Sequence, residues 1–117
     1  MTKEIMIGDK PITFTSNGAT PLYYRNFFKK DLLKEINTDN VEMELATENI
    51  PELAFIMAKQ ADKANMLNLE MKHYFEWLEQ FNPLDLTMMG KEIFMVYVAD
   101  SVPIEEPKKK GKGRAKE

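Results

Sequence analysis

Hydrophobic and polar residues alternate at the start of the chain, and this alternation predicts a β-hairpin over residues 3–15. Ile5 and Ile7 alternate with polar or flexible neighbours, and Ile12 and Phe14 do the same after a Gly-Asp-Lys-Pro connector. A two-stranded hairpin is only marginally stable by itself. We therefore expect its Ile and Phe face to pack against helices.

The residues after the hairpin predict a first helix from Thr20 to about Asn37. Thr20 is a good N-cap residue, and Pro21 at the first helical position loses no hydrogen bond. The apolar side chains of this segment fit one broad helical face, with most of the charged residues opposite: Leu22, Tyr23, Phe27, Leu32, Leu33 and Ile36. The acidic residues 41–49 are interpreted as a loop or a short helical turn.

Three further helices are predicted. The first begins at residues 49–51, and its expected buried stripe consists of Leu53, Ile56, Met57, Gln60 and Ala61. The second covers residues 69–81 with Asn68 as its cap, and the third covers about residues 84–99. Asn82–Pro83 separates the last two, because a residue before proline avoids helical geometry. The expected fold is α+β and mainly α, with the hairpin packed on about four helices in a single domain, residues 1–104.

Composition narrows the functional classes. A chain of 117 residues without cysteine fits one small domain and excludes disulfides, thiolate metal sites and cysteine nucleophiles. Neither a membrane span nor a signal peptide is apparent, so a cytoplasmic location is expected. The net charge of −3 is uneven: residues 105–117 carry six basic and three acidic side chains, and residues 1–104 carry ten and sixteen. We expect the basic tail to be disordered and the acidic body to disfavour nucleic acid.

Candidate catalytic chemistry is sparse. The single histidine, His73, has no obvious nucleophile beside it, and we interpret it as a residue of the helix surface. Glu70, His73 and Glu76 share roughly one helical face, but such a stripe is common on exposed helices and predicts no metal site. The glycines are scattered and form no phosphate-binding loop. The sequence therefore predicts no catalytic residue, no cofactor and no metal, and the chain is not expected to be an enzyme.

Methionine is abundant, with nine residues in the chain. Methionine is flexible and polarisable, so it suits surfaces that adapt to a partner, although it also fills cores. Met66–Leu67 in a predicted loop is one candidate for an exposed contact. The principal candidates for partner binding combine an aromatic band that is too wide for one buried stripe with a tryptophan and a methionine pair: Tyr23, Tyr24, Phe27, Phe28, Trp77, Met88 and Met89. Each of them is also compatible with a place in the core.

Three segments of the chain resemble one protein family. Residues 12–32, with the turn Asn17-Gly18-Ala19-Thr20-Pro21 running into a helix that contains Tyr24-Arg25, are similar to the start of tail assembly chaperones. These proteins belong to long-tailed, siphovirus-type phages and prophages of Gram-positive bacteria. Residues 57–62 (MAKQAD) and 76–81 (EWLEQF) resemble later motifs of the same family. Residues 3–8 and 38–49 match nothing in it.

The resemblance implies a non-enzymatic factor in virion morphogenesis. Such a chaperone binds the tape measure protein, recruits tail tube subunits and is absent from the mature virion, and we expect it to form homo-oligomers in the host cytoplasm. An alternative is a small prophage-encoded interaction or regulatory protein that uses its basic tail to bind nucleic acid or an acidic partner.

Overall fold

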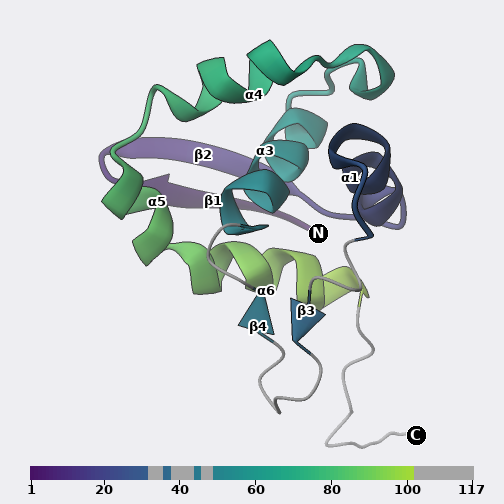
Figure 1. Cartoon of the computed structure of the whole chain (residues 1–117). Coiled ribbons are helices and arrows are strands. Elements are labelled where there is room, and N and C mark those ends of the chain that lie inside the picture. Colours follow the sequence, from purple (N-terminus) through teal and green to yellow (C-terminus); the bar gives the residue numbers. More distant parts are fainter. Residues whose placement is uncertain (32–35, 38–43, 46–48, 102–117) are drawn as a thin grey trace, which may run out of the picture.

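The chain forms an N-terminal β-hairpin that packs against helices. The computed structural model describes residues 1–31, 36–37, 44–45 and 49–101. Its elements, in chain order, are β1 (Thr2–Ile7), β2 (Lys10–Thr15), α1 (Thr20–Phe28), β3 (Ile36–Asn37), β4 (Glu44–Leu45), α3 (Ile50–Ala61), the 3-10 helix η2 (Met66–Asn68), α4 (Met71–Leu78), α5 (Pro83–Met88) and α6 (Gly90–Ser101) (Figure 1). The α+β, mainly α fold class expected from the sequence is confirmed.

The hairpin is closed by a tighter turn than the sequence suggested. β1 and β2 pair antiparallel, and the last pair joins Ile7 to Lys10, so the turn contains only Gly8 and Asp9. Gly8 has φ 65°, a left-handed conformation that glycine adopts without steric cost. Pro11 belongs to β2, where it lies opposite Met6.

One face of the hairpin is part of the core. Ile5, Ile7 and Phe14 are all less than 5% exposed, and they pack against α3 and α6. The expectation that the Ile and Phe face is covered by helices is confirmed.

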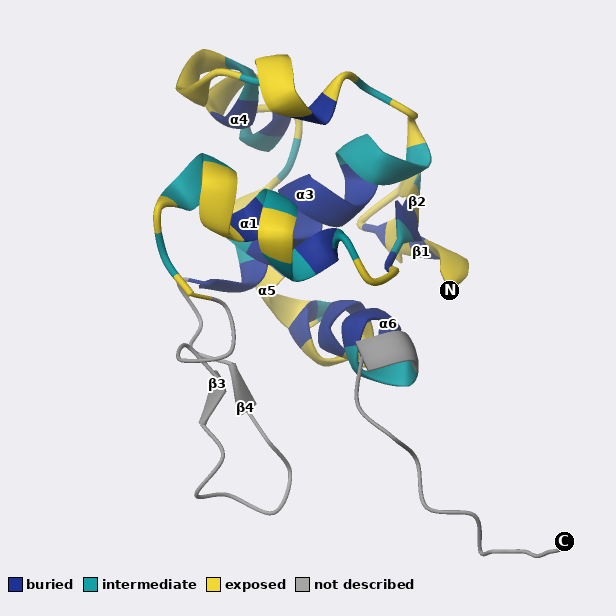
Figure 2. Ribbon diagram, turned by 90° about the vertical axis from the view of Figure 1, so that its right-hand side faces the viewer, coloured by how far each residue is buried: buried dark blue, intermediate teal, exposed yellow. Residues whose placement is uncertain are grey.

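The central element is α3, which is buried almost all round. Its six residues 53–58 are buried without interruption, whereas the sequence predicted a stripe along one side. Figure 2 shows α3 in dark blue over most of its length, between α1, α4, α6 and the hairpin. Ala54 and Ala58 have small side chains, which let the neighbouring elements approach closely. The amphipathic pattern was misleading here because a helix with neighbours on every side needs no polar face.

The first helix is much shorter than predicted. α1 ends at Phe28, because Lys29 adopts the left-handed conformation with φ 61° and donates its backbone N–H to the Arg25 carbonyl. Lys30 then reaches Glu52 of α3 at 3.0 Å. Ile36–Asn37 forms β3 and pairs with Glu44–Leu45 in β4, so the predicted helix over residues 20–37 is wrong at residues 29–31 and 36–37. Residues 32–35 lie outside the described part of the chain.

Side chains of α1 also differ from the expected pattern. Thr20 is the first helical residue instead of the N-cap, which is Ala19. Leu22, predicted on the buried face, is 65% exposed, whereas Tyr24 is fully buried. The interpretation of residues 41–49 can be compared only at Glu44–Leu45, which belong to a strand, and at Asn49, which precedes α3; the others lie outside the described residues.

The C-terminal helices are divided differently from the prediction. α4 begins at Met71, with Glu70 instead of Asn68 as its N-cap. The predicted helix over residues 84–99 is interrupted at Met89 and forms two helices, α5 and α6. Gly90 is buried where α6 begins, and a Cβ atom there would lie 3.5 Å from Ile50, so α6 starts in close contact with α3.

Two further expectations concern the domain boundary and membrane-spanning helices. The proposed boundary between a body, residues 1–104, and a tail, residues 105–117, falls outside the described residues. Over the part that the structure describes, no helix is both long and apolar enough to cross a membrane.

Candidate interaction surface

A continuous cluster of aromatic rings connects α1, α3 and α4. Phe55 of α3 lies at its centre, with its ring centroid 5.4 Å from that of Phe27, 5.2 Å from Tyr74 and 5.8 Å from Trp77. The ring of Phe28 lies 5.0 Å from that of Tyr74, which joins α1 directly to α4. Aromatic pairs at such separations stabilise a fold by about 0.5–1.5 kcal/mol beyond the area they bury. The cluster therefore fixes the end of α1 beside α4.

The structure separates the seven proposed contact residues by their exposure. Tyr24 and Trp77 are 0% and 7% exposed, so they belong to the core, which corrects their assignment to the surface. Tyr24 is buried because its hydroxyl finds partners inside the fold, and Trp77 because its ring packs between Phe55 and Phe81. The other five reach the surface to different extents. Met88 is 68% exposed, and four are half-buried: Tyr23, Phe27, Phe28 and Met89.

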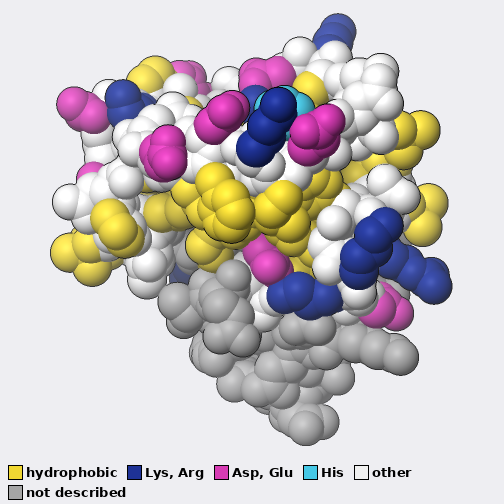
Figure 3. All heavy atoms as spheres, turned by 45° about the horizontal axis from the view of Figure 1, so that its top comes forward, with side chains coloured by type: hydrophobic (Ala, Val, Ile, Leu, Met, Phe, Trp, Pro, Cys, Tyr) yellow, Lys and Arg dark blue, Asp and Glu magenta, His cyan; other side chains and the backbone are white. Residues whose placement is uncertain are grey.

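The exposed edge of the ring cluster forms a surface that we call the aromatic face, which consists of Phe27, Phe28, Met71, Phe75 and Leu78. Met71 and Phe75 are 44% and 56% exposed, and the ring of Phe75 lies 5.7 Å from that of Tyr74. Figure 3 shows hydrophobic side chains gathered in a band below the charged side chains that surround the single histidine of α4.

The contact candidates chosen from the sequence did not include Met71 or Phe75. Their spacing of four residues places them side by side on α4, and this spacing could have identified them from the sequence. Of the pair Met66–Leu67, only Leu67 is exposed, at 71%, and Met66 is buried.

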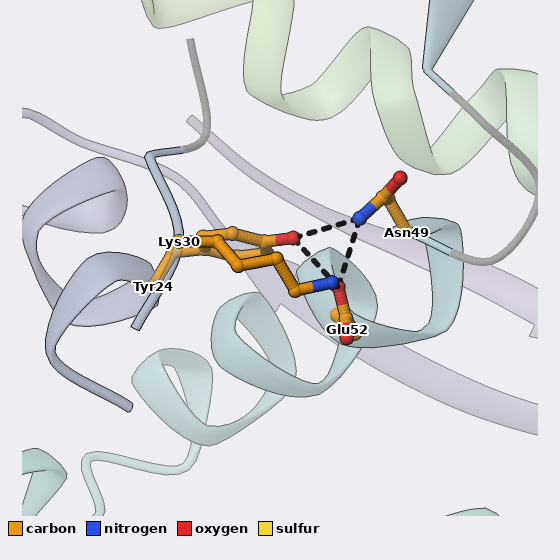
Figure 4. A network of polar contacts seen from close by, with 4 residues as sticks. All are labelled: Tyr24, Lys30, Asn49 and Glu52. Atoms are coloured by element: carbon orange, nitrogen blue, oxygen red, sulfur yellow. Dashed lines mark hydrogen bonds and ion pairs between the residues drawn. The ribbon is translucent and has the colours of Figure 1, made fainter. Parts of the chain in front are cut away.

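A polar network fastens the end of α1 to the start of α3 (Figure 4). One carboxylate oxygen of Glu52, Oε1, accepts from the Tyr24 hydroxyl at 2.6 Å, the Lys30 ammonium at 3.0 Å and Asn49 Nδ2 at 3.0 Å. Asn49 Nδ2 also donates to the Tyr24 hydroxyl oxygen at 3.1 Å. Hydrogen bonds to a charged acceptor are stronger than neutral ones. The network thus holds the chain reversal after α1 in place, next to the aromatic face.

Tyr74 lies between this network and the aromatic face. Burial, and then the negative charge of Glu52, raise the pKa of its hydroxyl from 10.0 to about 12. Both effects disfavour the tyrosinate form. The hydroxyl of Tyr74 therefore stays protonated to a higher pH than that of an exposed tyrosine.

Two of the segments that carry the family resemblance meet in space. The Thr20 hydroxyl accepts from the Asn17 backbone N–H at 2.9 Å and donates to Gln60 Oε1 at 2.8 Å. Gln60 Nε2 donates to Asn17 Oδ1 at 3.2 Å, and the Ala19 backbone N–H donates to the same oxygen at 2.9 Å. This turn network, Asn17, Ala19, Thr20 and Gln60, joins the Asn-Gly-Ala-Thr-Pro turn to the end of α3. The residues of these two similar segments therefore stabilise the fold by connecting the turn to α3.

His73 has a structural part: its Nδ1 accepts from the Glu70 backbone N–H at 2.9 Å, and the Glu70 side chain accepts from the His73 backbone N–H, which completes a capping box at the start of α4. Over residues 1–31 and 49–99, no three His, Asp or Glu side chains are grouped closely enough to hold a metal ion.

Comparisons with protein-family models, with curated proteins and with solved structures return no match. The family resemblance of the three segments thus stays a prediction, and the functional argument depends on the surface itself.

Proposed function

We propose that this chain is a non-enzymatic tail assembly chaperone of a long-tailed, siphovirus-type phage or prophage of Gram-positive bacteria. In this proposal it binds the tape measure protein, recruits the tail tube subunits during tail morphogenesis and acts as a homo-oligomer. It works in the host cytoplasm and is not part of the mature virion.

The observation that carries the proposal is the aromatic face. It combines a phenylalanine ring and a methionine that are about half exposed with three half-buried apolar side chains. Phe27 and Phe28 come from the segment that resembles the start of the family, and Leu78 comes from the segment at residues 76–81. Contiguous apolar surface on a small protein often marks a contact with another polypeptide.

The physical properties of this face suit a long helical partner. A tape measure protein exposes apolar helical surface before the tube encloses it, and such surface aggregates unless it is covered. An apolar face between two helices accepts the apolar side of a third one. Many weak contacts along one partner become strong together when the bound subunits also touch one another.

The test uses three lysine substitutions at positions of similar exposure. Phe75→Lys changes the aromatic face, and Met88→Lys changes the second proposed contact, on α5. Met95→Lys is the control, because Met95 is 52% exposed on α6, which lies on the opposite side of α3 from α4 (Figure 1). Each full-length variant is co-expressed with the tape measure protein of the same phage, and the co-purified amount is measured.

We expect Phe75→Lys to reduce co-purification at least about fivefold, since truncating an interface anchor costs about 1 kcal/mol or more. Met88→Lys should also weaken it, and Met95→Lys should not. Thermal unfolding checks that all three variants fold. Equal co-purification by the Phe75 and Met95 variants would refute the placement of the contact. No co-purification by the unmodified chain would refute the function.

The proposed homo-oligomer leads to a separate prediction. Sedimentation of the purified chain should show species whose size increases with concentration, and a strict monomer at high concentration contradicts the multivalent coat.

The basic tail, residues 105–117, supports the alternative function, in which the chain binds nucleic acid or an acidic partner. Deleting this tail distinguishes the two functions. A salt-dependent shift of DNA that disappears when residues 105–117 are deleted would favour a protein that uses its basic tail on nucleic acid.

A further inference from the structure

We propose that the occupant of the aromatic face is an amphipathic helix whose two flanks carry opposite charges, and that these charges set the direction in which it lies. This inference rests on the proposed function and specifies the partner of the same surface. It follows from the charges on the two borders of the aromatic face.

The border on α1 is basic. Arg25 lies three residues before Phe28, which places the two side chains next to each other on α1. Lys29 follows at the end of the helix. Arg25 and Lys29 are exposed. Lys30 is paired with Glu52, which offsets its charge. The three cations line a shallow hollow together with Leu22, Asn26 and Asp31, so this border has three basic side chains and one acidic one.

The border on α4 is acidic. Glu76 and Glu79 are exposed next to Phe75, with Glu79 one helical turn after it. Lys72 is on the same side of α4, but its ammonium lies 3.8 Å from the Glu70 carboxylate, which offsets it. In Figure 3 the row above the hydrophobic band has more acidic than basic side chains, and a group of basic side chains lies at the lower right of the band, with an acidic one directly below the band.

An amphipathic helix fits these borders when acidic residues on one flank face α1 and basic residues on the other flank face α4. Turning such a helix end over end keeps its apolar stripe on the aromatic face but exchanges its flanks. Only one direction therefore pairs both flanks with opposite charges. Exposed ion pairs add little affinity each, so their main effect is on orientation and partner choice.

The experiment uses designed helical peptides with one apolar stripe and equal numbers of Glu and Lys. The split peptide carries Glu on one flank and Lys on the other, and the exchanged peptide has these flanks reversed. The mixed peptide has the same composition with both charges on each flank. Binding to the full-length chain is measured by fluorescence anisotropy at low and at high salt.

We expect the split and exchanged peptides to bind several-fold more tightly than the mixed peptide at low salt. The difference should vanish at high salt, where screening is complete over a few ångströms. Because the chain has no cysteine, Gln80→Cys at the end of α4 accepts a single label. Energy transfer from this label should place opposite ends of the split and exchanged peptides near it.

A charge-reversed protein provides the matched control. Arg25→Glu with Lys29→Glu makes both borders acidic, so the preference for the split peptide should disappear and a peptide with Lys on both flanks should bind best. Lys10→Glu with Lys91→Glu changes the net charge equally at exposed positions outside both borders and should leave the preference unchanged.

Equal binding of split and mixed peptides at low salt, or the same peptide end near the label for both flank orders, overturns the inference. So does the absence of peptide binding by a chain that still co-purifies with the tape measure protein. The proposed function fails separately, when that co-purification is absent.

Discussion

The turn network that joins Asn17, Thr20 and Gln60 makes a sharp prediction about stability. Thr20 is fully buried, and its hydroxyl is both an acceptor and a donor. Thr20→Val keeps the shape of the side chain but removes both hydrogen bonds. Thr20→Ser keeps the hydroxyl and removes one buried methyl group.

The two substitutions differ in expected cost. Each hydrogen bond contributes about 1 kcal/mol net, and the Asn17 N–H also loses its acceptor, so Thr20→Val should lower the free energy of unfolding by about 2 kcal/mol. The loss of one methyl group in Thr20→Ser costs about 0.8–1 kcal/mol. For a domain of this size, 1 kcal/mol corresponds to a change of roughly 4–8 °C in Tm, so the valine variant should melt about 10 °C lower.

Thermal and urea unfolding of the full-length chain measure both variants. A double-mutant cycle of Thr20→Val with Gln60→Ala should give an interaction free energy above about 0.5 kcal/mol, since the two side chains share a hydrogen bond. If Thr20→Val is as stable as the unmodified chain and Thr20→Ser is less stable, the site needs volume and not a hydroxyl. The reasoning on the turn network would then be wrong.

Three further predictions test other parts of the fold. Gly8→Ala should cost about 1 kcal/mol or more in urea unfolding, because Gly8 has φ 65° and its Cβ would lie 2.5 Å from the Asp85 carboxylate, whereas Gly18→Ala, with open space around it, should be nearly neutral. His73→Ala should lower the free energy of unfolding by about 0.5–1 kcal/mol, because half of the capping box is lost. An unchanged urea midpoint would show that His73 does not stabilise the start of α4. The raised pKa of Tyr74 means that the folded chain holds this proton more tightly than the unfolded chain, so its contribution to stability is complete below pH 10.0 and is lost as pH rises through about 12. Urea midpoints across this range should fall less steeply in Tyr74→Phe.

Local signals in the sequence predicted the hairpin and the presence of the helices well, and long-range contacts account for the errors. The alternation around Ile5 and Ile12 needs only the neighbouring strand to take effect. After α1 the chain brings Lys30 to Glu52, 22 positions later, and the start of α6 lies against Ile50. Neither partner is visible from a helical pattern read locally.

The candidate surface was predicted only in part for a related reason. Tyr24 was a surface candidate because the aromatic band of its segment is too wide for one buried stripe, but its hydroxyl finds hydrogen-bond partners inside the fold. Met88 is exposed as the contact hypothesis requires. The exposure of Phe75 depends on how α4 is rotated against its neighbours, and the side chains of α4 that pack on Phe55 of α3 are Tyr74 and Trp77.

The position of α3 in the middle of the chain has a consequence for the order of folding during synthesis. The hairpin and α1 precede it, whereas α4 and α6 follow it, and all of them pack on it. A nascent chain that has just completed α3 therefore has an apolar helix covered on only some of its sides. Stable structure has to wait until the ribosome has delivered the residues up to about Tyr97, the last fully buried large side chain among the residues whose burial the structure describes. The elements that pack on α3 then fold together, so unfolding of the finished chain should be cooperative.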